Sequence, residues 1–420
     1  MQLEKPRVFN DTKSFVWVLL GLSSIIILRL ALSYQEYRSF IQKPFYYTYA
    51  EVISEKVKTS HEKSYRVLKL HSDNGLQFIT TSYTKNSYAN RRLRLQIFPD
   101  ERISFRGYLG TFFVKSRIKE VLSKEKSLKE RLLEKVNAQH PSEHLASFYH
   151  AIFFAEPLPA KLRDQIGKLG VSHLVALSGF HLGILWGIVY GFLSLLYRPL
   201  QQRYFPYRFV LIDVGVVTLS VLALYLWFVG APPSLVRSYA MLLVGWGVLL
   251  LGMELLSFRF LWIVVGIVLL LIPSLVVSLG FWFSVAGVFS IFLLLKYTKN
   301  SSRYMLSLAV IPLGVFLLML PIVHTVFPVT TPYQLLSPLL SLLFVPFYPL
   351  VIVLHLVGYG GVLDEVLFQL FQFPSDTEVY LLSTEMMVAY ILLAFLSIKY
   401  RYAFLLLVSA ALTYAGYLFL

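Results

Sequence analysis

The segment HLVALSGFHLGIL, residues 173–185, holds two histidines and a serine within an otherwise apolar stretch. Ser178 and His181 are three positions apart, so on a helix their side chains share one face. A serine beside a histidine base is a candidate nucleophile, and His173 with His181 is a candidate metal-binding pair. However, two side chains on one turn leave no groove for a substrate, and no nearby acid or cysteine completes either site. We therefore predict no catalytic residue, no metal site and no cofactor.

The same segment is better suited to line a hydrated path through a membrane. Gly179 and Gly183 permit close helix packing or a local break, and irregular backbone at membrane depth needs protein or water beside it. A second polar candidate is Arg237, which follows the Pro-Pro step of GAPPSLVRSYAM, residues 230–241. A guanidinium near a helix start can face a water-filled cavity and bind a phosphate.

Other ionisable residues fall inside predicted spans, where a charge is costly. They are Asp213, Glu254, His324 and His355. We expect Asp213 to pair with Arg208, Glu254 to reach the membrane interface, and the two histidines to be satisfied interior groups.

The elements that position these residues are membrane helices. The chain has 420 residues and is 57% hydrophobic, and many apolar runs approach the roughly 20 residues that cross a bilayer. After a first run at Phe15–Ser33, the candidate spans are 173–197, 209–230, 234–256, 258–273, 277–297, 304–327, 333–357, 379–397 and 401–420. We therefore predict a polytopic α-helical membrane protein. Three prolines in the span 333–357 predict that it is broken or re-entrant, with Val362–Phe373 as an alternative half-span.

Basic residues orient these spans. Lys5, Arg7 and Lys13 precede the first run, which we interpret as a retained anchor with a cytoplasmic N-terminus. The loops that carry Arg198, Arg203 and Arg208, and Lys296, Lys299 and Arg303, are predicted to be cytoplasmic as well. The polar segment between the anchor and residue 173 then lies on the opposite side of the membrane.

That polar segment carries most of the positive charge. Positions 34–143 hold 21 Lys and Arg against 12 Asp and Glu, within a net charge of +15 for the chain. Alternating apolar patterns predict strands at Tyr46–Val57, at Tyr65–Tyr83 on either side of Asn74-Gly75, at Arg91–Phe98 and at Arg102–Leu109. Several short strands indicate a small all-β domain of the OB-like type. Charge spacing predicts an exposed helix over Arg117–Gln139.

Cationic and aromatic residues are interleaved in this domain. The candidate DNA-binding residues are Arg91, Arg92, Arg94, Arg102, Arg106, Tyr83 and Tyr88. Such a surface suits single-stranded nucleic acid, because cations bind phosphates and rings stack on bases. The alternative, which composition alone slightly favours, is a solvated basic domain beside anionic lipid headgroups.

The chain thus divides into four predicted parts. They are residues 1–33, a cytoplasmic segment and membrane anchor; 34–115, an OB-like basic domain; 116–171, an amphipathic helical connector; and 172–420, a multi-span channel domain. The chain has no cysteine, which excludes disulfides. It also has no Walker A motif, so that ATP-binding loop is absent.

Four segments, in order and spacing, resemble ComEC-type competence proteins, the inner-membrane channels for DNA uptake. They are HLVALSGFHLGIL (173–185), GAPPSLVRSYAM (230–241), IPSLVVSLGFWFSVAGV (272–288) and SPLLSLLFVPFYPLVI (337–352). In the third segment Ser278, Gly280, Phe281 and Ser284 match the family pattern, whereas an Asp is missing and Trp282 replaces a Gln. In the second, Ser238 replaces an Ala.

The resemblance implies a bacterial inner-membrane channel, not an enzyme, that moves single-stranded DNA from periplasm to cytoplasm in natural transformation. The implied DNA path comprises His173, Ser178, Gly179, His181, Gly183, Arg237, Gly280, Phe281 and Ser284. The implied partners are single-stranded DNA, a periplasmic DNA receptor, a cytoplasmic helicase or recombinase motor, and membrane lipid. Longer members carry a metallo-β-lactamase-like domain, whose His-x-His-x-Asp-His run does not occur here. We therefore expect the short form of the family and a separate nuclease.

Two other functions stay open from the residues alone. One is an intramembrane serine hydrolase that uses Ser178 and His181. The other is a transporter of a lipid-linked polymer or a small anion.

Overall fold

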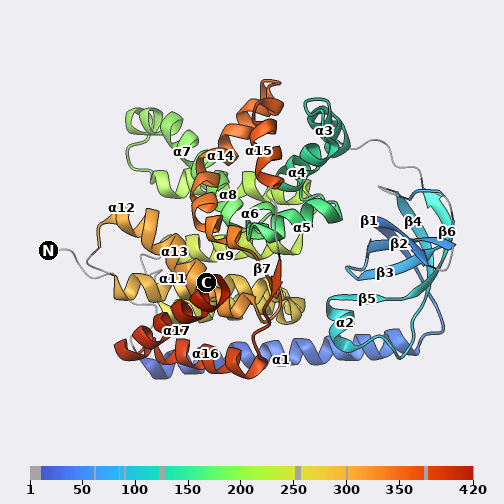
Figure 1. Ribbon diagram of the computed structural model, residues 1–420, viewed down its shortest axis with the longest axis horizontal. Helices are drawn as coiled ribbons and strands as arrows, with labels where there is room; N and C mark the ends of the chain where they lie inside the picture. The colour runs from blue at the N-terminus through green and yellow to red at the C-terminus, as the bar shows by residue number, and fades with distance from the viewer. Residues whose placement is uncertain are drawn as a thin grey trace. The chain divides into compact units, whose positions relative to one another are not determined.

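The computed structural model describes residues 11–419, except 61–62, 85, 89–90, 123–127, 251–256, 299–300 and 373–376 (Figure 1). Glu254, Lys299 and the end of the predicted span 234–256 lie outside the described residues. The chain forms two compact units. One contains Asp11–Arg131 and Val265–Leu279, and the other contains Leu132–Val264 and Gly280–Leu420.

The first unit begins with the long helix α1 (Thr12–Gln42), which is apolar and long enough to cross a membrane. Asp11 caps it by accepting a hydrogen bond from the Ser14 N–H at 3.1 Å. The last turns of α1 carry Tyr37 and Phe40, which are buried in the core of the β-domain. The Tyr37 hydroxyl also donates to the Ile103 carbonyl at 2.7 Å. The end of the anchor helix is therefore part of the β-domain.

A six-stranded sheet follows α1, in the order β5-β3-β2-β1-β4-β6. The strands are β1 (Tyr46–Ser60), β2 (Lys63–Ser72), β3 (Gln77–Ser82), β4 (Arg92–Phe98), β5 (Thr111–Phe113) and β6 (Lys115–Leu122). Only Val114 separates β5 from β6, yet β5 pairs with β3 and β6 pairs with β4. The Val114 N–H donates to the Ile79 carbonyl at 2.9 Å, and the hydroxyls of Thr80 and Ser116 lie 2.8 Å apart. The two edges of the sheet thus meet, and the predicted small all-β domain is confirmed.

Alternate residues of the strands fill the interior of this domain. The fully buried side chains include Leu68, Leu70, Phe78, Leu93, Leu95 and Ile97. Each such side chain contributes about 1.5–3 kcal/mol when it is removed from water. The residues between them point outward, so the period-2 pattern determines which side chains form the outer surface.

Two predictions in this unit are wrong. Arg102–Leu109 is not a strand, because Ser104 caps the short helix α2 (Phe105–Leu109) by accepting from the Gly107 N–H at 3.1 Å. Arg117–Gln139 is not one helix, since β6 extends to Leu122 and the helix among the described residues of this segment is α3 (Leu128–Asn137). The charge spacing of β6 suits a helix, but pairing with β4 along the sheet overrides this local preference.

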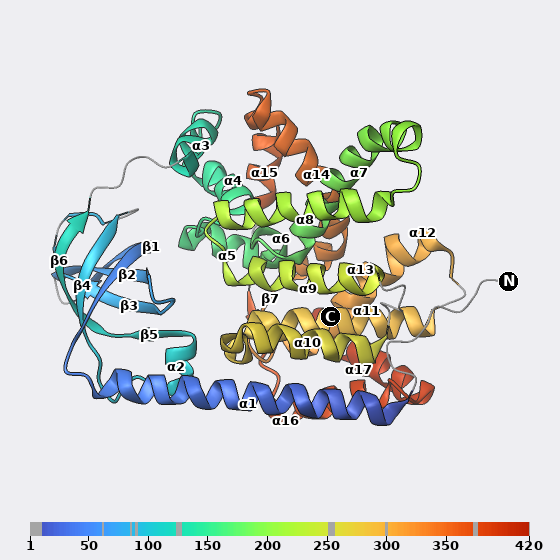
Figure 2. The ribbon, with the colours of Figure 1, turned by 180° about the vertical axis from the view of Figure 1, so that it is seen from behind.

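Most of the remaining described chain is helical. The helices are α4 (Glu143–Phe154), α5 (Ala160–Lys168), α6 (Ser172–Val175), α7 (Gly179–Tyr204), α8 (Val210–Phe228), α9 (Pro233–Leu250), α10 (Phe258–Leu271), α11 (Leu279–Tyr297), α12 (Arg303–Met305), α13 (Ile311–Val323), α14 (Ser337–Leu356), α15 (Asp364–Phe371), α16 (Thr384–Leu396) and α17 (Arg401–Phe419). Short strands β7 (Val329–Thr330) and β8 (Glu378–Val379) pair with each other. Figure 2 shows α8 beside α9 from behind.

Seven helices within the described residues are long and apolar enough to span a membrane, so the chain is a multi-pass membrane protein, as predicted. Helix α14 continues through Pro346 and Pro349 without a break. The alternative half-span at Val362–Phe373 contains α15, which has only 8 residues. The predicted break in span 333–357 is therefore not seen, whereas a re-entrant course of this span and a half-span at Val362–Phe373 stay predictions.

Helices α4, α14 and α15 pack around one apolar core in the second unit. Tyr149 and Ile152 of α4 and Tyr348 and Val351 of α14 are fully buried there. The Tyr348 hydroxyl donates to the Ile152 carbonyl at 3.2 Å. This core also holds Leu174 of α6 and thereby fixes the backbone that leads into α7.

Candidate functional site

Ser178 and His181 together begin helix α7. Ser178 is the N-cap residue, and its hydroxyl accepts from the Phe180 N–H at 3.3 Å. The Ser178 N–H donates in return to His181 Nδ1 at 3.4 Å. This reciprocal arrangement is a capping box, which satisfies N–H groups at a helix start. The spacing of serine and histidine is thus explained by helix capping, and the Ser178 hydroxyl also lies 3.5 Å from His181 Nδ1, at the long limit of a hydrogen bond.

The His181 ring is fully buried, at 0% exposure, against α14. Its ring centre lies 5.0 Å from that of Phe344 and 4.9 Å from that of Tyr348. Because Nδ1 accepts the Ser178 N–H, the ring proton belongs on Nε2, which has no hydrogen-bond partner among the described residues. His181 therefore supports the start of α7 from inside the protein.

His173 has different surroundings. Its Nε2 lies 3.2 Å from the hydroxyl of Ser341 on α14. Within the described part of the chain, no group of three or more His, Asp or Glu side chains is placed to hold a metal ion. His173 and His181 thus both contact α14, each with its own partners.

The two glycines of the segment have different roles. A Cβ on Gly179 would lie 3.1 Å from the hydroxyl oxygen of Ser238 on α9, so a larger residue would push α7 and α9 apart. A Cβ on Gly183 would meet nothing within 4 Å. The Ser234 hydroxyl on α9 adds a second contact by donating to the Leu177 carbonyl at 2.7 Å. The start of α7 is therefore held against α9.

Arg237 also lies on α9, and its side chain reaches α11. It is only 5% exposed, and its Nη2 donates to the Ser284 hydroxyl at 3.1 Å. Its Nη1 lies 3.5 Å from the position that a Cβ on Gly280 would take. Phe281, the next residue, is fully buried. The predicted residues from three separate segments thus meet around positions 237 and 238 of α9.

In the β-domain, Arg92 and Arg94 lie over tyrosines of the neighbouring strand β1. The Arg92 guanidinium is 5.5 Å from the ring centre of Tyr49, and that of Arg94 is 6.0 Å from Tyr47 and 5.9 Å from Tyr49. Tyr47 is 50% exposed and Tyr49 40% exposed. We name Tyr47, Tyr49, Arg92 and Arg94 the Tyr–Arg face.

The Tyr–Arg face also contacts carboxylates. Arg92 forms an ion pair with Asp73, and Arg94 lies 3.9 Å from Glu120. Sequence reasoning found the two arginines but missed the two tyrosines. The available signal was the alternation in YYTYAEV, which places Tyr47 and Tyr49 on one side of β1 and the buried Ala50 on the other.

The two predicted tyrosines differ from each other. Tyr83 is 74% exposed, with its ring 6.1 Å from that of Tyr65. Tyr88 is only 7% exposed, so its ring supports the core and offers no free stacking surface. The Tyr88 N–H donates to Glu55 Oε2 at 2.8 Å. Arg91, which follows this segment, is exposed.

Glu55 organises the same part of the domain. Burial alone would raise the pKa of Glu55, but hydrogen bonds from the Ser87 hydroxyl, the Tyr88 N–H and Arg66 outweigh it and lower the pKa. The carboxylate is therefore ionised at neutral pH and ties β1 to Arg66 on β2.

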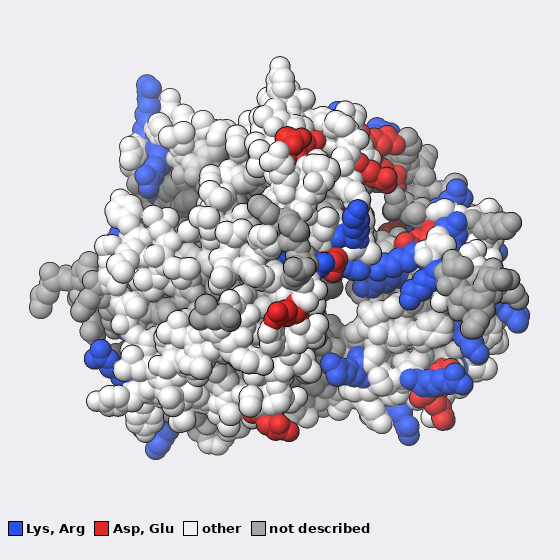
Figure 3. All heavy atoms as spheres, viewed as in Figure 1, with Lys and Arg blue, Asp and Glu red and all other residues white. Residues whose placement is uncertain are grey.

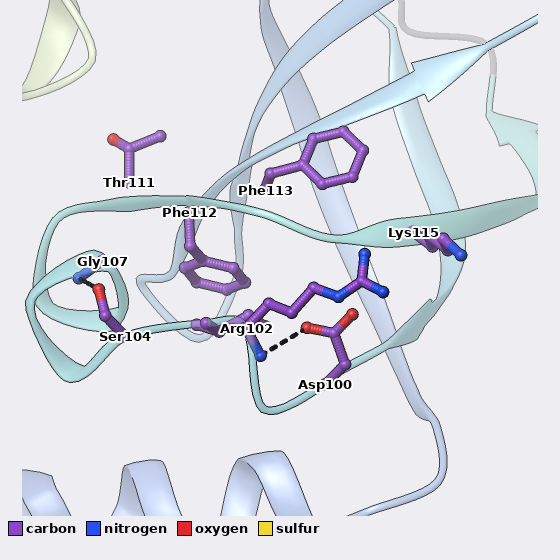
Figure 4. A pocket seen from close by; sticks show the side chains of 9 residues that line it. Asp100, Arg102, Ser104, Gly107, Thr111, Phe112, Phe113 and Lys115 are labelled. Carbon is purple, nitrogen blue, oxygen red and sulfur yellow. Dashed lines mark hydrogen bonds between the residues drawn. The ribbon is translucent and has the colours of Figure 1, made fainter.

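Arg102 lines a pocket of about 270 Å³ beside α2 (Figure 4). The backbone N–H of Arg102 donates to the Asp100 carboxylate at 3.0 Å. Phe113 and Lys115 line the same pocket. Arg106 is exposed on α2 and is not part of this lining. The predicted basic residues of the β-domain are therefore distributed over several surfaces. Figure 3 shows Lys and Arg gathered over the strands, while the visible helical surface is largely uncharged.

Comparisons with known proteins agree with this architecture. A family model described as "Competence protein" matches residues 155–420. A protein of Aquifex aeolicus (strain VF5), described only as uncharacterized, is 27% identical over 315 residues. That alignment covers 72% of this chain and 66% of the relative, just under two thirds of its length. No solved structure matches.

Proposed function

The chain belongs to the competence protein family, and from this premise we propose that it is an inner-membrane channel for single-stranded DNA. In this proposal DNA enters from the periplasm and reaches the cytoplasm during natural transformation. The family indicates a role in DNA uptake, and all four segments that resemble it lie within the matched residues 155–420. The seven apolar helices supply the membrane-spanning part.

The observation that carries the proposal at the level of binding is the Tyr–Arg face. Exposed rings stack on bases in single-stranded DNA, at about 1–3 kcal/mol per base, and adjacent arginines bind the phosphates. Tyr47 and Tyr49 offer such rings, with Arg92 and Arg94 already placed over them. A DNA phosphate would compete with Asp73 and Glu120 for these arginines. We propose that this face captures the strand on the periplasmic side.

The strand order supports the proposed OB-like character of this domain. An OB-fold is a small, partly open barrel of five strands that binds oligonucleotides on the face of strands 2 and 3 and on two loops, and the Tyr–Arg face would add a surface on β1 and β4. Here β5 and β6 act as one interrupted strand that joins β3 to β4. The Tyr–Arg face lies on β1 and β4, so it belongs to the strands rather than to a flexible loop.

We propose that the DNA path passes the place where the starts of α7, α9 and α11 come together. Gly179, Gly183, Arg237, Gly280 and Ser284 are its candidate lining residues. Ser178 lies at the start of α7 and His173 on the preceding helix α6, whereas the buried His181 and Phe281 would position the lining instead of touching DNA. Contacts along such a path must be weak and numerous, because a tight site would stall a polymer.

The proposed channel needs partner proteins for the steps that this chain does not itself supply. No Walker A motif occurs in the chain, so the proposal needs a separate cytoplasmic helicase or recombinase to pull the strand. A periplasmic receptor would deliver the DNA, and a separate nuclease would remove the complementary strand.

Binding of a labelled single-stranded oligonucleotide to the full chain in detergent tests the capture step. Tyr49→Ala should weaken binding about tenfold, which corresponds to about 1.4 kcal/mol of lost stacking. Tyr83→Ala is the matched control, since Tyr83 is an exposed ring of the same domain outside the Tyr–Arg face. Equal affinities for wild type and Tyr49→Ala would exclude this face as the capture surface.

A further inference from the structure

Arg237 is a buried cation that has no buried counter-charge among the residues that the structure describes. Only 5% of the residue is exposed, its single hydrogen bond within the described residues goes to the Ser284 hydroxyl, and Nε has no partner. No Asp or Glu side chain in the described part of the chain forms an ion pair with it. Burial of a charge is costly unless the charge is paired. Among the described residues, the environment of Arg237 therefore lacks an anion.

The start of helix α11, which lies beside Arg237, also favours an anion. Gly280 and Ser284 lie in the first two turns of α11, a helix of 19 residues. The start of a helix carries a partial positive charge, which repels a cation and attracts an anion. Arg237 Nη1 nevertheless lies beside Gly280. An anion between the guanidinium and the start of α11 would interact favourably with both.

Gly280 bounds the guanidinium on the side of α11. Gly280 is exposed and has no side chain, so the guanidinium is not covered from this side by a Cβ. Ser284 donates to the Gly280 carbonyl at 3.1 Å, which leaves its oxygen to accept from Arg237. Nη1 and Nη2 face Gly280 and Ser284, so this end of the guanidinium is the fork that can bind two oxygens of one phosphate.

We propose that Arg237 and the start of α11 form a binding site for a phosphate group. The phosphate of a DNA backbone and that of a lipid headgroup share this chemistry. Assignment of the phosphate to DNA rests on the proposed function, whereas the site itself does not. Gly280 keeps the site open, and Ser284 holds the guanidinium in place.

Thermal unfolding of the purified full chain in detergent tests the site. Inorganic phosphate, compared with chloride at equal ionic strength, should raise the Tm of the wild type by about 2 °C or more. Arg237→Gln should abolish this rise. Arg208→Gln, which removes an exposed arginine paired with Asp213, should keep it. Without phosphate, Arg237→Gln should be no less stable than the wild type, because it removes an uncompensated charge.

A second pair of variants tests the site without removing the arginine. In Gly280→Ala the new Cβ lies 3.5 Å from Nη1, an ordinary contact that the fold tolerates, but it narrows the opening. Gly287→Ala is the matched control on the same helix, where a Cβ meets nothing within 4 Å. The rise in Tm should shrink in Gly280→Ala and persist in Gly287→Ala. Equal rises in wild type, Arg237→Gln and Gly280→Ala, or no rise in the wild type, would overturn the proposal.

Two further ligands identify the source of the phosphate. They are an eight-nucleotide oligothymidylate and a short-chain phosphatidylglycerol. For each ligand, the increase in Tm that it causes is measured in the wild type and in Gly280→Ala, and the two increases are compared. A difference with the oligonucleotide assigns the site to DNA, and a difference with the lipid alone assigns it to a headgroup. Loss of DNA uptake without loss of the phosphate response in a Tyr–Arg face variant would separate the capture step from this site.

Discussion

His181 has the residue type and spacing of a catalytic base, but its contacts in the structure stabilise a helix start. Its Nδ1 accepts the N–H of Ser178, and its ring lies against Phe344 and Tyr348. Both interactions stabilise the start of α7. The residue therefore acts on the proposed path by holding Ser178 and Gly179 in position.

His181→Ala should lower the free energy of unfolding by about 2 kcal/mol or more, because it removes the capping interaction and leaves a cavity. His181→Gln should recover part of this loss, since a glutamine at this position can complete a capping box. Chemical unfolding of the full chain in detergent measures both. Unchanged stability in the two variants, together with lost DNA uptake, would mean that the ring itself touches DNA.

Glu55 makes the β-domain sensitive to acid. Its pKa is lower in the folded protein than the ordinary value of 4.5, so its contribution to stability is complete above that value. This contribution is lost as the pH falls below about 4.5 through the folded-state pKa. Thermal unfolding measured from neutral to acidic pH should show a steeper loss for wild type than for Glu55→Gln. Parallel pH profiles would contradict the role of this carboxylate.

Among the elements, α14 and α15 are joined to the loop before α4 by a buried polar chain. His140 Nδ1 lies 2.9 and 3.0 Å from the Asp364 oxygens, His140 Nε2 lies 2.9 Å from His355 Nε2, and His355 Nδ1 lies 2.6 Å from the Val351 carbonyl. The two imidazoles, the Asp364 carboxylate and the Val351 carbonyl thus form one continuous chain of polar contacts.

Asp364→Asn should destabilise the protein by about 1–3 kcal/mol, because it weakens the buried contact between the carboxylate and His140 Nδ1. Glu365→Gln is the matched control, since Glu365 is the next residue of α15 and contacts only Gln369 among the hydrogen bonds of the described chain. Chemical unfolding compares the two. Similar small losses for both variants would show that the polar chain contributes little.

Element types were predictable where local pattern and tertiary pairing agree. Strands β1 to β4 and most apolar helices follow the alternation and the apolar runs of the sequence. The prediction fails at Arg102–Leu109 and at Arg117–Gln139, because a serine cap and pairing at the sheet edge decide those segments. Helix α14 is continuous although Pro346 and Pro349 each lack the N–H of a helical hydrogen bond, so the prolines alone do not predict where this helix ends.

Contacts between residues far apart in the chain could not be predicted from the sequence. It identified Arg237, Gly280 and Ser284 separately, but their meeting depends on how α9 packs against α11. It treated His355 as a satisfied interior histidine, which agrees with its hydrogen bonds, yet it gave no sign of His140 and Asp364. Pairing across more than 200 positions leaves no local pattern.

For the whole molecule, charge and hydropathy are divided between the parts of the chain. Lys and Arg gather over the strands, whereas the visible helical surface is largely uncharged (Figure 3). This division suits a basic domain that captures a polyanion and a helical part that lies in lipid. It also suits attraction to anionic headgroups, so a measurement on DNA itself has to decide between them.

Uptake of labelled DNA by a transformable strain that lacks the gene tests the central claim most directly. The account predicts that label accumulates outside the cytoplasm in this strain and that the wild-type gene restores its entry into the cytoplasm. Tyr83→Ala should restore entry as well, and a double Tyr47→Ala, Tyr49→Ala variant should restore much less at equal expression. Normal entry of label into the cytoplasm of the strain without the gene would contradict the proposal that this chain is the channel.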